Sequence, residues 1–347
     1  MKLSLFLVST AGLWVAANAN SVNNKQTKND VCTHPFVDIN GRCLFVNNFA
    51  QMDWDAARAF CAGFQGDLVT LDEANLLADI VDFIYKEGLT DRSYWIGGSA
   101  GAQTGAFVWP DGSLVRMGTP CWGVLDNIQR PGAEPNEKCI ALNKDNFFFF
   151  DNFNCEGEIS VICEYKFQRE NRWAEGGCAT MKSSAVFVFL AAALLGSDGA
   201  TEAGSHVKTD VCTHPFVDIN GRCLFVNNFA QMDWDAARDF CAGFQGDLVT
   251  LDEANLLADI VEFISKEGLT ERSYWIGGSD RALEGEWTWT DGSSVRMGTP
   301  TWGANGQNQQ PTGGSEENCV GLDNANFFFF NDFPCVTAMS LICELKL

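Results

Sequence analysis

Apolar and polar residues follow patterns that predict the same short elements twice along the chain. In the first copy, residues 32–48 alternate around Asn40-Gly41, which predicts a small disulfide-closed hairpin. Asp53 is expected to cap a helix that ends at Gly63 or Gly66. The inward face of this helix is marked by apolar residues at helical spacing, namely Trp54, Ala57 and Cys61.

A second helix and a set of strands are expected to follow. Residues 68–71 have the pattern of a short strand, Asp72 is expected to cap the second helix and Gly88 to end it. The apolar positions of this helix are Leu76, Leu77, Ile80, Val81, Phe83 and Ile84. Strand patterns occur at residues 94–96, 107–109, 139–142, 147–150 and 159–165, around a long loop between residues 110 and 137. This order predicts an α+β domain whose long loop is either functional or disordered.

The chain is a tandem duplication. The string from Asp30 to Arg58 recurs from Asp210 to Arg238, an offset of 180 residues, and six cysteines keep that offset. We expect domains at residues 30–166 and 210–347, joined by residues 167–209. The copies diverge mainly in their second halves, where they have been free to differ.

Two segments have the character of secretory signals. Residues 1–19 combine Lys2, an apolar run and a small-residue site, which predicts a signal peptide and a secreted protein. Residues 181–200, within the linker, repeat that layout around eleven apolar residues, too few to cross a membrane, so no membrane insertion is expected. Two explanations remain open: two neighbouring genes joined into one product, or a true two-domain protein with an apolar linker.

Composition narrows the function classes. The 347 residues carry a net charge of -22, which would repel nucleic acid and anionic lipid. Fourteen cysteines occur without any Cys-x-x-Cys pair and with only three histidines, which favours disulfides over zinc. No catalytic triad or phosphate loop is present, so an enzyme is the least expected class. His34 and His214 are expected at the surface.

The residues of each copy resemble the C-type lectin-like domain. The resemblance is carried by Cys61, Trp95-Ile96-Gly97-Gly98, Trp109-Pro110-Asp111-Gly112, Cys139, Cys155 and Cys163, and it covers nearly all of both copies. It implies these disulfides: Cys32–Cys43, Cys61–Cys163, Cys139–Cys155, Cys212–Cys223, Cys241–Cys343 and Cys319–Cys335. The style of the sequence also resembles invertebrate, crustacean-like immune lectins.

Cys121 and Cys178 fall outside that scheme. They could pair with each other, link chains through an intermolecular disulfide, or be unpaired thiols.

The same resemblance implies a Ca²⁺ and carbohydrate site in the second copy. Calcium prefers about six to eight oxygen ligands, and sugar hydroxyls can supply two of them. The implied ligands come from the long loop and a late strand: Gln310, Thr312, Glu317, Asn331 and Asp332. Thr312 stands where the resemblance implies an Asp, so one carboxylate is missing and calcium affinity should be lower. Asp280 and Glu284 match an auxiliary calcium site.

The first copy holds a mannose-type tripeptide, Glu134-Pro135-Asn136, and further ligand candidates in Glu137, Asp151 and Asn152. At the 180-residue offset, however, Gln310 corresponds to Arg130. A Pro-rich turn in an acidic loop is the alternative interpretation of these residues.

The resemblance implies a calcium-dependent lectin that binds microbial or cell-surface glycans and agglutinates through paired domains. The rival hypothesis is a calcium-independent protein-interaction module of the same fold. The runs Phe147–Phe150 and Phe327–Phe330 are expected to be strand core rather than an exposed aromatic patch.

Overall fold

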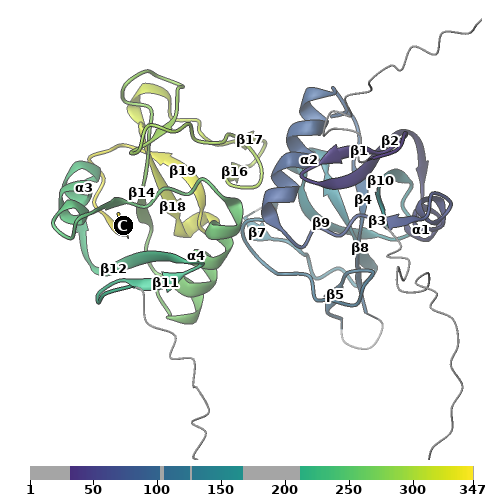
Figure 1. Cartoon of the computed structure of the whole chain (residues 1–347), viewed down its shortest axis with the longest axis horizontal. Helices are drawn as coiled ribbons and strands as arrows, with labels where there is room; N and C mark the ends of the chain where they lie inside the picture. Colours follow the sequence, from purple (N-terminus) through teal and green to yellow (C-terminus); the bar gives the residue numbers. More distant parts are fainter. Residues whose placement is uncertain (1–31, 102–104, 126, 167–211, 347) are drawn as a thin grey trace, which may run out of the picture.

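The computed structural model describes residues 32–101, 105–125, 127–166 and 212–346, which form two domains of the same design (Figure 1). The expected signal peptide, the linker and Cys178 lie outside these residues. Within the described ranges, no helix is long and apolar enough to cross a membrane.

The first domain is an α+β unit, as expected. Its helices are α1 (Trp54–Ala62) and α2 (Ala74–Lys86). Its main sheet contains β1 (Val37–Ile39), β2 (Arg42–Met52), β10 (Ile159–Tyr165), β4 (Tyr94–Ala100), β8 (Glu137–Asn143) and β9 (Phe149–Asn154), in that order. Strand β3 (Gly66–Leu68) pairs with β10, and β5 (Phe107–Val108) pairs with β4. The hairpin β6 (Val124–Leu125) and β7 (Ile128–Gln129) projects from the long loop.

The second domain repeats this plan. Its helices are α3 (Trp234–Ala242) and α4 (Ala254–Lys266). Its sheet order is β11 (Val217–Ile219), β12 (Arg222–Met232), β20 (Met339–Leu345), β14 (Tyr274–Ser279), β18 (Cys319–Asp323) and β19 (Phe329–Phe333). Strand β13 (Gly246–Leu248) pairs with β20, β15 (Thr288–Trp289) pairs with β14, and β16 (Ala304–Asn305) pairs with β17 (Asn308–Gln309).

Local sequence signals account for the first half of each domain. Asn40 and Gly41 both have positive φ, 53° and 75°, so the β1–β2 hairpin turns where it was predicted. The Asp53 side chain accepts a hydrogen bond from the Ala56 amide at 2.8 Å and begins α1. The strand expected at residues 68–71 is wrong in position, because β3 ends at Leu68.

The expected cap of the second helix is also wrong. Asp72 forms an ion pair with Arg42 at 3.1 Å, and α2 begins after Glu73, which provides no side-chain cap. The Ala74 amide instead donates to the Asn255 side chain of the second domain at 2.8 Å. Sequence reasoning misses this bond because the capping oxygen lies 181 residues away.

Each domain has its own core and its own disulfides. The buried apolar clusters of the first domain contain residues of that domain alone, and those of the second domain do likewise. The structure pairs the cysteines as the resemblance implies: Cys32–Cys43, Cys61–Cys163, Cys139–Cys155, Cys212–Cys223, Cys241–Cys343 and Cys319–Cys335. Each disulfide therefore closes a loop within one domain. Six disulfides are typical of proteins from oxidising compartments.

The phenylalanine runs are only partly the strand core that was expected. Strands β9 and β19 begin at Phe149 and Phe329, so the strand predicted at residues 147–150 is wrong for its first half, where Phe147 and Phe148 turn with positive φ. One position of each run also lies between the domains. Phe148 and Phe150 are buried in the main cluster of the first domain. Phe149 is equally buried, yet its ring packs edge-on against Phe329 of the second domain, with centroids 5.1 Å apart. His34 and His214 are exposed, as predicted.

Candidate functional site

The long loop of the second domain is held against β19 by an aromatic anchor. Phe330 packs edge-on against Trp289 and Trp302, with ring centroids 5.9 and 5.8 Å apart. The Gln310 amide donates to the Gly303 carbonyl at 2.8 Å, and the Gln310–Pro311 bond is cis. These contacts bring the loop beside Asn331 and Asp332, the residues after Phe330.

Asp332 organises the loop after Pro311. Its side chain is almost fully buried and accepts hydrogen bonds from the amides of Thr312 at 3.0 Å and Gly313 at 2.6 Å. Glu317 lies next to Gly313. Burial and then the negative charge of Asp332 raise the pKa of Glu317 above its ordinary value. Two carboxylates that repel each other in this way favour a nearby cation.

Gln310 and Asn331 line a polar pocket on the other side of the loop. The pocket has a volume of about 370 Å³, and its second-domain lining is Ala304, Asn305, Gln310, Asp323, Ala325, Asn326 and Asn331. The side-chain oxygen Oε1 of Gln310 accepts from the Thr312 hydroxyl at 2.8 Å, and the side-chain Nδ2 of Asn331 donates to the Asp323 carboxylate at 3.3 Å. The pocket therefore presents amide and carboxylate groups that can bind hydroxyls.

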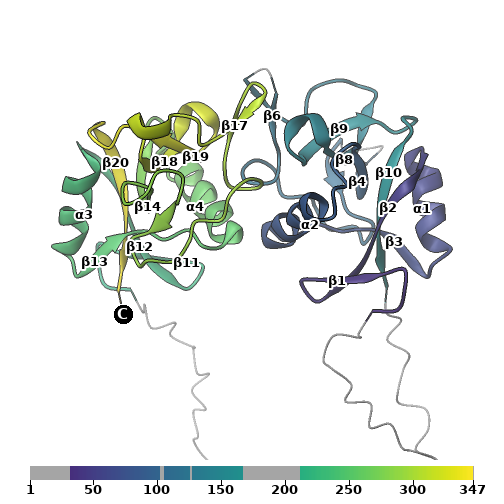
Figure 2. The same ribbon diagram turned by 90° about the horizontal axis from the view of Figure 1, so that it is seen from above.

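Two parts of this pocket, Asp323 and the β6–β7 hairpin, were not predicted from the sequence. Asp323 ends β18 and accepts a hydrogen bond from the Asn331 side chain on the neighbouring strand β19, and burial raises the pKa of the Asp323 carboxyl group. Val124 and Asn127 come from the β6–β7 hairpin of the first domain. Figure 2 shows that hairpin beside β17. No sequence motif marks either contribution, because each arises from segments that meet only in the fold.

Asp280 and Glu284 lie in the turn after β14. Asp280 is 2% exposed, and its Oδ2 atom accepts from the Gly285 amide at 2.9 Å. Its Oδ1 atom is buried and has no hydrogen-bond partner among the described residues. Glu284 is exposed, with its carboxylate close to Gly314 on the long loop.

The side-chain oxygens of the second-domain site are of the chemical type that binds a hard cation such as calcium. The Oδ1 atoms of Asp280 and Asn331 are both buried and unpaired within the described residues, and an unpaired buried oxygen is costly. Carboxylate and amide oxygens are the ligands that calcium prefers. The described part of the chain contains no cluster of three or more His, Cys, Asp or Glu side chains at metal-binding distance. A bound ion would therefore use amide or backbone oxygens as well, or a small movement of the loop.

An arginine occupies the corresponding place in the first domain. Arg130, at the position of Gln310, donates its Nε to Asp151 and its Nη2 to Glu137 at 3.1 Å. Asn152, at the position of Asp332, accepts from the Gly132 amide at 2.7 Å and donates to Glu137 at 3.2 Å. The structure thus brings Glu137, Asp151 and Asn152 together around a guanidinium. The carboxylates of Asp151 and Glu137 therefore already have a cationic partner within the described residues.

The mannose-type tripeptide lies apart from that group. Glu134 and Asn136 are exposed, and no hydrogen bond between described residues joins their side chains to Glu137, Asp151 or Asn152. The backbone amide of Arg130 donates to the Gly123 carbonyl at 2.8 Å, as that of Gln310 does to the Gly303 carbonyl, so the loop register follows the 180-residue offset rather than the position of the tripeptide.

Comparison with known proteins agrees with the fold. The family model of the lectin C-type domain matches residues 50–165 and 230–345, about two thirds of the chain. The chain belongs to the C-type lectin domain family. Because this family consists of non-enzymatic lectins, the expectation that the chain is not an enzyme is confirmed.

Individual relatives match one domain or parts of both. Human C-type lectin domain family 17, member A is 30% identical over 135 residues, 39% of this chain and 32% of that protein. The galactose-specific lectin nattectin of Thalassophryne nattereri is 30% identical over 173 residues, 49% of this chain and 99% of nattectin. The solved SPL-1–GlcNAc complex is 29% identical, covering 39% of this chain and 94% of that one, with a TM-score of 0.33. Relatives from human and fish do not single out a lineage.

Proposed function

We propose that this protein is a secreted lectin whose second domain binds a carbohydrate with the help of Ca²⁺. The observation that carries the proposal is the polar pocket lined by Gln310 and Asn331, where the buried Oδ1 atom of Asn331 has no hydrogen-bond partner among the described residues. The Oδ1 atom of Asp280, in the turn after β14, is a second buried oxygen without such a partner. Bound calcium would supply positive charge to the carboxylates and open coordination positions to sugar hydroxyls. The residues that would hold calcium are Glu317, Asn331 and Asp332, with Asp280 and Glu284 at the auxiliary site.

Each side chain of the second-domain site has its own task in this proposal. Asp332 keeps the loop in place through the amides of Thr312 and Gly313. Gln310 and Asn331 orient hydroxyls in the pocket, since each carries both a donor and an acceptor. Thr312 offers a hydroxyl where family members have a carboxylate or amide, so calcium affinity should be modest.

A galactose-like ligand is the proposed preference of the second domain. The Gln310 arrangement is of the galactose type in the family, and nattectin, a relative described as galactose-specific, is 30% identical. Glycans on microbial or host cell surfaces are the proposed partners, in innate-immune recognition. A mannose-like preference stays a prediction for Glu134 and Asn136 of the first domain.

A calcium-independent module is the second candidate function, and Arg130 favours it for the first domain. Its guanidinium already forms ion pairs with Asp151 and Glu137. A divalent cation would have to compete with Arg130 for these two carboxylates. The first domain would then contact its partner through the loop surface without a metal ion.

Calcium titration by calorimetry on each separate domain, followed by glycan-array binding with and without EDTA, tests both candidates. We expect calcium binding and EDTA-sensitive glycan binding by the second domain only. Asp332→Ala in that domain should abolish EDTA-sensitive sugar binding while the disulfide-held fold persists in circular dichroism. Unchanged glycan binding by this variant would contradict the proposed site.

The form of the mature protein is a separate proposal. Residues 181–200 have the layout that signal peptidase recognises, so the native material should be two domains of roughly half the 38 kDa mass. A single band of full mass on a reducing gel, with peptides from residues 186–200 detected by mass spectrometry, would contradict it.

A further inference from the structure

The two domains meet through the same surface on each, which we term the pairing surface. In the first domain it consists of α2, Arg116, Thr119, Phe147 and Phe149, and in the second domain of the residues 180 positions later. Helices α2 and α4 contact each other across it (Figure 1).

Each helix begins with a cap that comes from the opposite domain. The Asn255 side chain accepts from the Ala74 amide at 2.8 Å, and the Asn75 side chain accepts from the Ala254 amide at 2.8 Å. Neither Glu73 nor Glu253 caps its own helix through its side chain. The first amides of a helix need such a partner, and each domain here meets the need of the other.

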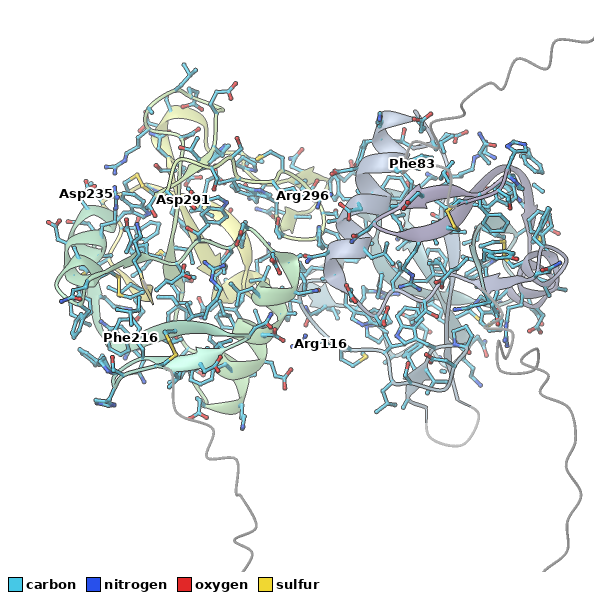
Figure 3. The ribbon with its side chains drawn as sticks, viewed as in Figure 1. Phe83, Arg116, Phe216, Asp235, Asp291 and Arg296 are labelled. Carbon is cyan, nitrogen blue, oxygen red and sulfur yellow. A yellow bond between two sulfur atoms is a disulfide. The ribbon has the colours of Figure 1, made fainter. Side chains whose placement is uncertain are left out.

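Two arginines bridge the domains in the same reciprocal way. Arg116 pairs with Asp259 at 2.9 Å and with Glu262 at 2.7 Å. Arg296 pairs with Asp79 at 2.8 Å and with Asp82. Figure 3 shows both arginines at the border between the domains. In two acidic domains, these cations reduce the repulsion between the facing helices.

The remaining contacts are also doubled. The Thr119 hydroxyl donates to the Phe327 carbonyl and the Thr299 hydroxyl to the Phe147 carbonyl, each at 2.5 Å. Phe149 and Phe329 pack on each other in the middle of the surface. Every one of these contacts therefore has a counterpart at the 180-residue offset or lies on the symmetry axis.

This arrangement is self-complementary. In a two-fold dimer, if residue i of one copy contacts residue j of the other, then residue j of the first copy also contacts residue i of the second. The pairing surface meets this condition. The contacting residues are identical in the two domains, except that Glu262 replaces Asp82 and keeps the charge. A second copy of either domain could therefore make the same set of contacts.

Nothing covalent within the described residues is needed for this pairing. Each domain carries its own apolar clusters and three disulfides, so each can fold alone. The contacts between the domains are hydrogen bonds, ion pairs and one ring contact, all of which can form between separate chains.

We propose that the pairing surface is a two-fold self-association surface, and that its partner is a second C-type lectin domain of this sequence on a separate chain. Cleavage between the domains would then leave a non-covalent pair. Bivalent presentation of the ligand loops would not depend on the linker.

The test is the oligomeric state of the second domain, residues 210–347, expressed alone. Sedimentation equilibrium over a concentration series should show a reversible dimer that weakens with added salt, because its ion pairs are partly exposed. Arg296→Glu should shift the domain to monomer. Arg281→Glu is the matched control, since Arg281 pairs with Asp235 inside its own domain, and it should remain dimeric.

A charge exchange separates the proposal from simple misfolding. The double variant Asp259→Lys, Glu262→Lys should also be monomeric, because it faces Arg296 of its copy. Mixed with the Arg296→Glu variant, it regains an attractive pair at both ends of the surface, so the mixture should form a heterodimer. A wild-type domain that stays monomeric throughout, or a mixture that associates no better than its components, would overturn the proposal.

Discussion

A single exchanged residue accounts for much of the difference between the two loop sites. Arg130 and Gln310 occupy equivalent places on loops of the same shape. The arginine forms ion pairs with Asp151 and Glu137, whereas the glutamine borders a polar pocket with Asn331. A permanently charged guanidinium takes the role of a cation within the chain, and an amide leaves that role open.

Arg130→Gln should destabilise the isolated first domain. Asp151 is 4% exposed at its side chain, so removal of its partner leaves a buried charge, and we expect unfolding free energy to fall by about 3 kcal/mol. Urea unfolding measures the change. The control is Arg58→Gln, whose pair with Asp67 is more exposed and should cost less than about 1 kcal/mol. Equal losses in the two variants would contradict the role given to Arg130.

Cys121 should be an unreactive thiol in the full chain. Burial raises the pKa of Cys121 from 9.0 to about 12, despite the opposing charge of Arg116. At pH 8 this lowers the thiolate population by roughly a thousand-fold, and the thiolate is the reactive form. Iodoacetamide labelling followed by peptide mapping should show slow modification of Cys121 in native protein and fast modification after unfolding in urea. Fast labelling of the native chain would contradict this, whereas no labelling of Cys121 even after unfolding, without reduction, would indicate that it is in a disulfide.

At the scale of elements, helices α2 and α4 depend on each other at their first turns. Their apolar faces are set by local sequence, with Leu76, Leu77 and Ile80 buried in the first domain. Their first amides are satisfied by Asn255 and Asn75 from across the pairing surface. The start of each helix is therefore a property of the pair of domains.

Asn255→Ala should loosen a helix that lies in the other domain. The loss of a cap typically costs about 1 kcal/mol, and here the Ala74 amide of α2 loses its acceptor. Hydrogen exchange by mass spectrometry on the full chain should show faster exchange at residues 74–77. Asn228→Ala, in β12 and away from the pairing surface, serves as the control and should leave α2 unchanged. Exchange confined to the first turn of α4 would contradict the cross-domain cap.

At the scale of the whole molecule, domain pairing shapes the proposed binding pocket. The β6–β7 hairpin contributes Val124 and Asn127 to the pocket that contains Gln310 and Asn331. The first domain thereby adds a wall to the second-domain site, even though its own site is closed by Arg130. In the proposed function, the second domain binds the ligand and the first domain contributes part of the pocket lining.

Asn127→Arg in the full chain should weaken glycan binding by the second domain. A long charged side chain at this wall would enter the polar pocket or displace the hairpin, and we expect an affinity loss of about tenfold, equal to about 1.4 kcal/mol. Glycan titration by calorimetry measures it. Asn48→Arg adds the same charge at an exposed position of β2 and should bind as the wild type does. Equal affinity of all three proteins would show that the hairpin has no part in binding.

The sequence by itself determined the features that depend on neighbours along the chain. Helical spacing located α1 and the buried face of α2, the Asn40-Gly41 pair located the first turn, and the 180-residue offset located both domains. The resemblance then implied the six disulfides that the structure contains. The resemblance also implies Gln310, Asn331 and Asp332 as site residues, because a motif in one segment marks them, and their role in binding stays a prediction.

Only the tertiary structure decided which groups meet across long separations. Arg130 closes one site because its side chain reaches Asp151 on β9, and Asp323 joins the other because β18 and β19 run side by side. Glu134 and Asn136 match a motif in letters, but the loop turns at Pro131 and leaves them outside. The caps on α2 and α4 come from residues about 180 positions away. Contacts of this kind depend on how the sheet and the two domains bring distant segments together, which no local pattern records.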